Sequence, residues 1–399
     1  MSKVQIAGGG IGGLAAALAC ARAGHDVGLC ERAAEVVEVG AGVQLGPNVV
    51  KLLYGWGLQA ALGQVAFFPE QLQVRSATTG GQLGRLRLGE AFEQRYGAPY
   101  LTIHRADLHS VLLRAVQATG TVDLQFGKTI TGLTQSETAV NAVFSNDLKT
   151  HTDLLVGADG GWSTVRKLLL NDGTPQPTGH LAYRAMVPQG DLPVHLRSDV
   201  VTAWLGPKLH VVQYPVRGGD WLNVVAIVHG QVQGDMSHWD HSANAIDLQR
   251  SMAMACAQLQ ELVAAIAFWR LWPLSIRPPM RGAHEQAKGR VALLGDAAHP
   301  MVPYLAQGAG MAIEDAAALA WALAGSTQGT VPLNDVPAQL QRYAQARWQR
   351  NAQVQARAIK NGQIFHATGL MRWGRDAAMR LMGENLLNMP WLYGGVAHP

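Results

Sequence analysis

A run of glycines near the start of the chain has the composition of a phosphate-binding turn. Gly8, Gly10 and Gly13 fit the spacing G-x-G-x-x-G, Gly12 lies between them, and Glu31 follows 18 residues after the last glycine. Such glycines allow a tight turn and a close approach of the backbone to a pyrophosphate, while the carboxylate can accept hydrogen bonds from ribose hydroxyls. The motif predicts a dinucleotide site, and a packing turn without a ligand is the alternative.

The elements around the glycines support this interpretation. Residues 3–7 have the pattern of a short buried strand, residues 11–23 that of a helix ending at Gly24, and residues 26–31 that of a second strand. A strand, a glycine turn, a helix and a strand form a βαβ unit, which requires a parallel sheet and a right-handed crossover.

Two more loops with an acidic residue follow apolar strands. Residues 157–166 read GADGGWSTVR after the strand 153–156, and residues 295–300 read GDAAHP after the strand 291–294. Asp159 and Asp296 could face a ligand there, or they could only cap a turn. The presence of three such loops in one chain favours the ligand.

These three motifs resemble the fingerprints of the single-component flavin aromatic hydroxylases, the family of p-hydroxybenzoate and salicylate hydroxylases. Residues 157–166 are similar to its D-G motif and residues 295–300 to its G-D motif, and the resemblance extends from Val4 to Asp315. It implies an FAD-dependent monooxygenase that uses NADH or NADPH and O₂. The substrate would be a small phenolic or heteroaromatic acid, with salicylate-type hydroxybenzoates first, hydroxylated through a flavin C4a-hydroperoxide.

The resemblance also implies which residues contact FAD. Glu31 would bind the adenosine ribose, Asp296 the ribityl chain, and Ala309 with Gly310 would lie near the isoalloxazine ring. The expected cofactor-binding residues are Gly8, Gly10, Gly12, Gly13, Glu31, Arg32, Gly42, Arg105, Ile130, Asp159, Asp296, Pro303, Gly308, Ala309 and Gly310. Asp159 and Arg166 would hold the fold around the pyrophosphate and assist the pyridine nucleotide. Independently, a glycine-rich helix start after Pro303 would direct unpaired N–H groups at negatively charged reduced flavin.

Two residues could act on the substrate. His210 and Tyr214 lie four apart in a predicted strand, so they share one face with Val212. Together they could relay a proton from a phenol, although an isolated pair of this kind is more often a hydrogen-bonded core pair. Residues 209–215 resemble the strand of salicylate, 3-hydroxybenzoate and 6-hydroxynicotinate hydroxylases in which a His and a Tyr serve the substrate hydroxyl. The resemblance therefore implies catalytic roles for His210 and Tyr214.

Three positions depart from relatives of known specificity. Gln44 and Tyr304 stand where the 6-hydroxynicotinate enzymes carry histidines, and Pro303 stands where 3-hydroxybenzoate 6-hydroxylases carry a glutamine. These departures weaken the case for 6-hydroxynicotinate and for 3-hydroxybenzoate as the substrate. A 6-hydroxynicotinate-type hydroxylase, a flavin oxidase or dehydrogenase, and a flavin-binding scaffold without turnover remain the alternative functions.

The sequence does not decide which residue binds a substrate carboxylate. Arg184, Arg217 and Arg277 are candidates because a guanidinium can bind a carboxylate through two hydrogen bonds. His299 could contact a ligand or could be an interior histidine beside a strand end.

The order of the patterns predicts an α/β fold whose domains interleave. Apolar runs at 199–205, 209–216 and 221–229 are separated by turn residues and predict antiparallel strands. We expect a dinucleotide-binding domain with a parallel sheet, a mostly antiparallel substrate domain, and a helical C-terminal region. The expected ranges are 1–174 for the first part of the FAD-binding domain with substrate-domain insertions, 175–275 for the substrate domain, 276–335 for the return to the FAD-binding domain, and 336–399 for the helical region.

Composition excludes several classes of protein. The chain has 399 residues, a formal net charge of +4 and 15% charged residues, without the clustered basic stripe of a nucleic-acid-binding protein. Three scattered cysteines and no His-x-x-x-His pair predict reduced thiols and no metal site. Because no apolar stretch long enough to cross a membrane is present, we expect a cytoplasmic protein without stable membrane association, either a monomer or a homodimer.

Overall fold

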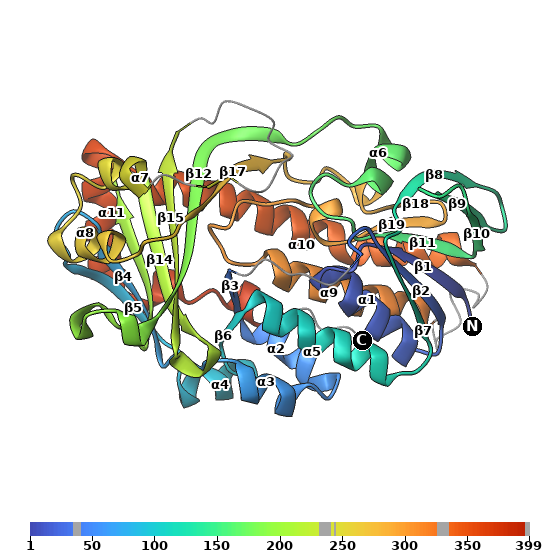
Figure 1. The fold of residues 1–399 in the computed structure, drawn as a ribbon, viewed down its shortest axis with the longest axis horizontal. Helices are drawn as coiled ribbons and strands as arrows, with labels where there is room; N and C mark the ends of the chain where they lie inside the picture. The colour runs from blue at the N-terminus through green and yellow to red at the C-terminus, as the bar shows by residue number, and fades with distance from the viewer. Residues whose placement is uncertain (35–40, 231–240, 243–244, 325–334, 396–399) are drawn as a thin grey trace.

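The structure is a computed structural model that describes residues 1–34, 41–230, 241–242, 245–324 and 335–395. Two large sheets lie at opposite ends of the molecule, and long helices run between them (Figure 1). The arrangement is the α/β fold expected from the sequence, with a parallel sheet, a mostly antiparallel sheet and C-terminal helices.

The first large sheet is built around the predicted βαβ unit. Its order is β18-β19-β11-β1-β2-β7, and all neighbouring pairs are parallel except β18 with β19. The strands are β1 (Lys3–Ala7), β2 (Asp26–Glu31), β7 (Val122–Phe126), β11 (Leu154–Gly157), β18 (Ala287–Lys288) and β19 (Val291–Leu293). Helix α1 (Ile11–Arg22) connects β1 to β2, so the strand, helix and strand predicted for residues 3–31 are confirmed.

The second large sheet has the order β16-β17-β12-β15-β14-β13-β4-β5. Its pairs are antiparallel except β13 with β4. The strands are β4 (Gln71–Ser76), β5 (Gln82–Arg87), β12 (Gln176–Pro188), β13 (Val201–Gly206), β14 (Leu209–Val216), β15 (Trp221–His229), β16 (His241–Ser242) and β17 (Arg270–Ile276). Two of its strands come from before residue 100, so the N-terminal part of the chain contributes to both sheets. The domain boundaries given above stay a prediction.

Two small sheets and the helices complete the described fold. The small sheets pair β3 (Gly42–Leu45) with β6 (Leu101–His104), and join β8 (Ile130–Gln135), β9 (Val140–Phe144) and β10 (Lys149–Thr152). The further α-helices are α2 (Pro47–Gly55), α3 (Gln59–Val65), α4 (Glu90–Tyr96), α5 (Arg105–Ala118), α6 (Thr164–Leu170), α7 (Ala245–Ser251), α8 (Ala257–Ala264), α9 (Gly308–Leu323), α10 (Val336–Phe365), α11 (Gly369–Met382), α12 (Glu384–Leu387) and α13 (Pro390–Tyr393). Short 3₁₀ turns are η1 (Gln189–Asp191), η2 (Val194–Leu196), η3 (Arg217–Gly219), η4 (Ala283–Glu285) and η5 (Gly295–Ala297).

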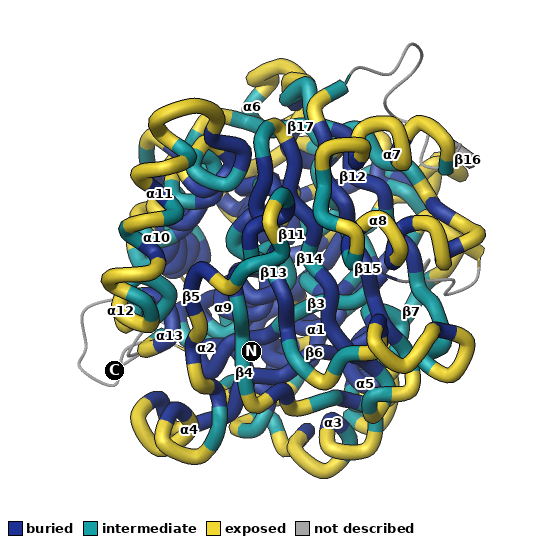
Figure 2. The backbone as a smooth tube through the Cα atoms, turned by 90° about the vertical axis from the view of Figure 1, so that its left-hand side faces the viewer, coloured by how far each residue is buried: buried dark blue, intermediate teal, exposed yellow. Residues whose placement is uncertain are grey.

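The core includes the packed interface between the helices α1, α9 and α10. Helix α1 is alanine-rich on its buried side, so α9 can pack closely against it, and α9 in turn packs against α10. Figure 2 shows the central strands in the buried colour and the outer turns of α3, α4 and α12 in the exposed colour. Cys20 and Cys30 are buried free thiols, as expected, whereas Cys256 is only half-buried.

The C-terminal segment packs onto the rest of the protein. Leu392 and Tyr393 are buried, and the Tyr393 ring makes edge contacts with the rings of Phe92, Tyr96 and Tyr100. The apolar sequence at 386–395 therefore serves packing. Within the described ranges, no helix combines the length and the apolar character that a membrane crossing requires.

Candidate active site

A cavity of about 700 Å³ opens where β1, β2 and β11 end. Gly8 has a φ of +106°, and a Cβ there would lie 2.4 Å from the carbonyl oxygen of Ala158. A Cβ on Gly13 would lie 1.8 Å from the Gly8 carbonyl oxygen, so both positions require glycine. In contrast, a Cβ on Gly10 would meet no protein atom within 4 Å. Gly10 borders the cavity beside the start of α1, where a ligand phosphate can approach the free N–H groups.

The acidic residue at the end of β2 is held in place by backbone donors. Oε2 of Glu31 accepts a hydrogen bond from the Gly9 N–H at 2.6 Å, and Oε1 accepts one from the Ala33 N–H at 2.9 Å. Both Glu31 and Arg32 line the cavity. The carboxylate therefore stands beside the glycine turn, as a ribose acceptor requires.

Most of the expected cofactor residues border this cavity. Those that line it are Gly8, Gly10, Gly12, Glu31, Arg32, Arg105, Ile130, Asp159, Asp296, Gly308 and Ala309. Gly42 and Pro303 line a second, adjoining cavity. Neither cavity is lined by Gly13 or Gly310, because both pack against protein: a Cβ on Gly310 would lie 2.9 Å from a Val49 methyl group.

The loop that carries Asp159 is tied to the loop that carries Asp296. The carboxylate of Asp159 accepts hydrogen bonds from the Ser163 hydroxyl and from the Val165 N–H, so it caps the start of α6 while lining the cavity. Burial raises the pKa of Asp159. The buried Arg166 guanidinium donates to the carbonyl oxygens of Ala297 and Ala298 in the other loop. The two motifs thus form one wall of the cavity.

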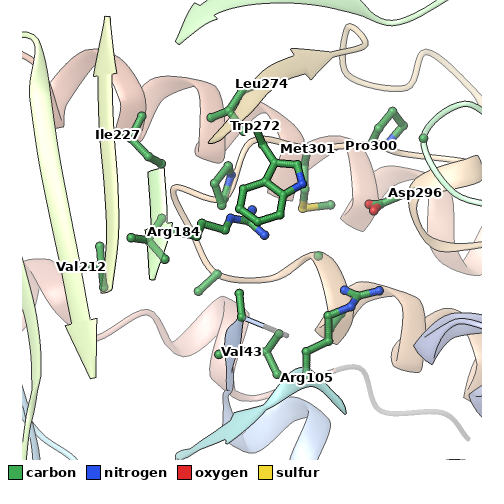
Figure 3. Close-up of a pocket in the computed structure, with 18 of the residues that line it drawn as sticks. Val43, Arg105, Arg184, Val212, Ile227, Trp272, Leu274, Asp296, Pro300 and Met301 are labelled. Carbon is green, nitrogen blue, oxygen red and sulfur yellow. The ribbon is translucent and has the colours of Figure 1, made fainter. Parts of the chain in front are cut away.

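The second cavity, of about 290 Å³, continues the first toward the antiparallel sheet (Figure 3). Arg105, Asp296 and Gly308 are among the residues that line both cavities. In Figure 3, the Asp296 carboxylate and the Arg105 side chain lie on opposite sides of the opening. The first turn of α9, which begins at Gly308, directs N–H groups without helical partners at this point. Together the two cavities extend from Glu31 and the glycine turn, past the start of α9, to His210, and this succession fits FAD.

His210 and Tyr214 line the second cavity together with Val212, on one face of β14. His210 is only 1% exposed, and its Nδ1 lies 2.6 Å from Nε2 of His366. Burial lowers the pKa of His210 to about 3, with a smaller contribution from His180. The His210 ring is therefore neutral at pH 7. It can hold a proton in this buried place only beside a negative charge, such as the phenolate that forms when a bound phenol loses its proton.

Tyr214 packs against the backbone at Gly42. A Cβ on Gly42 would lie 2.5 Å from the Tyr214 ring, which explains why glycine is required there. Burial raises the pKa of Tyr214, while the nearby Arg184 cation and a hydrogen bond to Gln44 oppose this shift. Its phenol is protonated at neutral pH and can donate a hydrogen bond.

A third cavity, of about 590 Å³, meets the second at His210. Gln44, Val212 and Pro303 also line both spaces. Its walls are mainly apolar and include Leu205 on β13 and residues of α10 and α11. His210 thus stands where the elongated cavity meets an apolar chamber that can hold an aromatic ring.

The structure separates the three candidate arginines. Arg217 is paired with Asp107 at 3.0 Å, and Arg277 is paired with Asp172 at 3.1 Å, away from His210. Arg184 lines the second cavity with its guanidinium 5.0 Å from the Trp272 ring (Figure 3). Its pKa is lowered by burial, and its Nε is buried without a hydrogen-bond partner. Arg184 is therefore the candidate placed to meet an anionic group of the substrate.

His299 is an interior histidine. It is fully buried, and its Nε2 lies 2.6 Å from Asp315. Asp315 and Glu314 also bind the buried Arg347 guanidinium at 2.7 and 2.8 Å. This ionic cluster joins α9 to α10, and no spacing in the sequence signals it because Arg347 lies 32 residues after Asp315.

A second group missed in the sequence is a cluster of histidines beside His210. It consists of His180, His229 and His366, with the Tyr304 hydroxyl bonded to Nδ1 of His180. The members come from β12, β15 and the end of α10. No sequence spacing signals the cluster, since strand pairing and the return of α10 bring the rings together.

Comparisons with known proteins identify relatives of this chain. Residues 1–358 match the family described as the FAD binding domain. The chain is 37% identical over 394 residues to 3-hydroxybenzoate 6-hydroxylase of Polaromonas naphthalenivorans (strain CJ2), covering 98% of this chain and 95% of the relative. It is 36% identical over 323 residues to 6-hydroxynicotinate 3-monooxygenase of Bordetella bronchiseptica (strain ATCC BAA-588 / NCTC 13252 / RB50), covering 79% and 81%. A solved salicylate hydroxylase substrate complex superposes with a TM-score of 0.82 at 26% identity, covering 99% and 96%.

Proposed function

This chain belongs to the family of FAD-dependent aromatic hydroxylases, and on that premise we propose that it hydroxylates a hydroxybenzoate whose phenol meets His210. The chain is an FAD-dependent monooxygenase acting on aromatic acids. The observation that carries the proposed site is the position of His210, buried and neutral, where the elongated cavity meets the apolar chamber.

The cofactor would be held by the residues of the first cavity. Glu31 and Arg32 would take the adenosine end, the turn at Gly10 the pyrophosphate, and the start of α9 the ring system. Bound FAD supplies hydride acceptance from NADH or NADPH and the transfer of one oxygen atom from O₂.

His210 would remove the phenol proton of the substrate. Its Nδ1 is engaged by His366, which leaves Nε2 for the substrate hydroxyl. Accepting the proton makes the aromatic ring richer in electrons, which hydroxylation by an electrophilic oxygen requires. Tyr214 would donate a hydrogen bond to the same oxygen and fix the orientation of the ring.

Arg184 would bind the carboxylate of the substrate. Its Nε is buried without a partner, so a carboxylate would satisfy a donor that the protein alone leaves unpaired. The surrounding Trp272 and Val212 side chains are apolar and would exclude water from the reacting groups.

A hydroxypyridine carboxylate is the second candidate substrate. It is favoured by the similarity to the Bordetella bronchiseptica 6-hydroxynicotinate 3-monooxygenase. Against it, positions 44 and 304 are a glutamine and a tyrosine, so neither supplies an imidazole to the cavity. Gln44 accepts a hydrogen bond from the Tyr100 hydroxyl at 2.8 Å, and the Tyr304 hydroxyl is bonded to His180.

The test is NADH and NADPH oxidation by the FAD-loaded protein with a panel of hydroxybenzoates and hydroxypyridine carboxylates. We expect one hydroxybenzoate to stimulate oxidation and to yield a product carrying one atom of ¹⁸O from ¹⁸O₂. Hydrogen peroxide as the only oxygen product for every compound would contradict the proposal. Gel filtration and cell fractionation would test the homodimer or monomer and the cytoplasmic location that we also propose.

A further inference from the structure

Three imidazole rings meet beside the active site, on the outer side of His210. His180 on β12 and His229 on β15 are directly opposite each other in the strand register, and His366 follows the end of α10. The ring centroids of the three pairs are 4.5, 4.9 and 5.0 Å apart. One nitrogen from each ring lies within 4.8 Å of the other two.

Hydrogen bonds from outside the group orient two of the rings. The Tyr304 hydroxyl is bonded to Nδ1 of His180, which leaves Nε2 of that ring available. His210 is bonded to Nε2 of His366, so that Nδ1 of His366 faces Nε2 of His229 at 3.0 Å. Metal-binding histidines commonly have their other nitrogen fixed in this way, because the bond sets both the tautomer and the ring direction.

The charge around the rings limits how strongly they can hold an ion. Neutral imidazole is the form that binds metal ions, so the affinity should rise with pH. The cations Lys208 and Arg375 act on His229 and His366 and oppose a bound cation, so the affinity should be moderate.

The group is accessible from solvent. His229 is exposed, His180 is half-buried and His366 is buried, so an ion can enter on the side of His229. Three nitrogen donors with one open side match the tetrahedral preference of zinc, in which a water completes the coordination.

We propose that His180, His229 and His366 form a binding site for one zinc-type divalent ion, with a water as the fourth ligand. Zinc–nitrogen bonds of about 2.0–2.1 Å in a tetrahedron place the nitrogens about 3.4 Å apart. The rings therefore move together by roughly 1 Å on binding, and the exposed His229 side chain has room to do so. Ligation through Nδ1 puts the proton of His366 on Nε2, which donates it to Nδ1 of His210, so the proton of neutral His210 then lies on its own Nε2. In the ion-bound state His210 therefore cannot act as the base. This site goes beyond the hydroxylation proposed above, and its test needs no turnover.

The test is titration of Co²⁺ into the FAD-loaded protein, with absorption recorded at wavelengths longer than the flavin bands. Tetrahedral Co²⁺ gives intense bands there, and Zn²⁺ should remove them by competition. Equilibrium dialysis should give one Zn²⁺ per chain. Octahedral Co²⁺ spectra, or no Zn²⁺ retained on dialysis, would overturn the proposal.

Substitutions test whether these three histidines bind the ion. His180→Gln and His229→Gln should each abolish the Co²⁺ bands, while His151→Gln, at an exposed histidine on β10, should leave them unchanged. Tyr304→Phe removes the bond that orients His180, and should weaken Zn²⁺ binding about 10- to 100-fold. Retention of FAD by each variant reports that it is folded, and His229→Gln carries the test if a buried variant does not fold. Unchanged bands in His180→Gln and His229→Gln would overturn the proposal.

Discussion

Nδ1 of His210 lies 2.6 Å from Nε2 of His366. His210 is on β14, a central strand of the antiparallel sheet, and His366 directly follows α10, the longest described helix. The contact fixes which nitrogen of His210 is free for the substrate. It also means that the position of the proposed base depends on how α10 packs against the sheet.

Replacing His210 by alanine should separate flavin reduction from hydroxylation. His210→Ala should still bind FAD and still be reduced by NADH or NADPH, because His210 does not line the first cavity, whose residues would hold the cofactor. Product formation should fall about 10²- to 10⁴-fold, the usual contribution of a general base. Stopped-flow absorbance measures reduction, and mass spectrometry measures product.

The outcome for His210→Ala has a matched comparison in His151→Gln, which changes an exposed histidine bonded to Asn141. That variant should keep both rates. A His210→Ala protein that forms product at the normal rate would exclude His210 as the base, and an equal loss of flavin reduction would point to a structural role.

Acid should destabilise the protein through its buried histidines. The pKa of His180 is lowered to about 4, that of His210 to about 3 and that of His366 to about 2, all by burial. Between these values and the ordinary histidine value, the unfolded chain binds more protons than the folded one. The stability contributed by each neutral ring is therefore present above about pH 6.5 and is lost at about 1.4 kcal/mol per pH unit as the pH falls below it.

Comparing Tm at pH 7.5 and pH 5.5 for the wild type and for His366→Gln measures this effect. The variant lacks one of the rings that must gain a proton, so its Tm should fall less between the two pH values. A larger fall in the variant would show that His366 is charged in the folded protein.

The glycine turn offers a test of cofactor binding without a change of fold. A methyl group at Gly10 would meet no protein atom within 4 Å, so Gly10→Ala should fold normally. The same methyl group points into the cavity that we assign to the pyrophosphate, and FAD affinity should fall at least about tenfold. Fluorescence titration of the apoprotein with FAD gives the Kd.

Gly63→Ala is the control for Gly10→Ala. Gly63 lies in α3, where a Cβ also meets no atom within 4 Å. Alanine there should stabilise the helix by about 0.5–1 kcal/mol and leave the Kd for FAD unchanged. Equal Kd values for the two variants would place the pyrophosphate elsewhere.

The sequence predicts those parts of the fold that depend on local patterns. Strand β14 occurs at its predicted bounds, Leu209–Val216, because an apolar run and flanking turn residues define a strand over a few residues. Strand β13 begins at Val201 rather than at the predicted residue 199, since the pairing of Val201 with Leu72 on β4 sets the first paired residue. The G-x-G-x-x-G turn was recognisable because its conformational demands fall on adjacent residues.

Features formed by distant segments were not predictable in the same way. The contact between His210 and His366 spans 156 residues, and no spacing rule connects them. The choice of Arg184 among three arginines required knowing that Asp107 and Asp172 neutralise the other two. Both results depend on tertiary packing rather than on sequence periodicity.

The ionic cluster that joins α9 to α10 should be essential for stability. Arg347→Met would remove the buried partner that Asp315 and Glu314 share, while His299 and Arg350 still contact these carboxylates. The cost should therefore be about 3 kcal/mol, at the lower end for a broken buried pair. Urea unfolding measures the loss. Arg250→Met breaks an exposed pair with Asp247 and should cost no more than about 1 kcal/mol. Equal costs for the two variants would show that the buried network does not hold α9 against α10.

Arg184 should determine affinity for the substrate carboxylate rather than the rate of the oxygen transfer. Arg184→Met keeps an apolar side chain against Trp272 but removes the donor aimed at the carboxylate. Loss of a hydrogen bond to a charged group is worth about 1.5–3 kcal/mol, so KM for a hydroxybenzoate should rise about 10- to 150-fold with a smaller change in kcat. A phenol of the same ring pattern without the carboxylate should show no such rise. If KM rises equally for both compounds, Arg184 shapes the cavity and the carboxylate binds elsewhere.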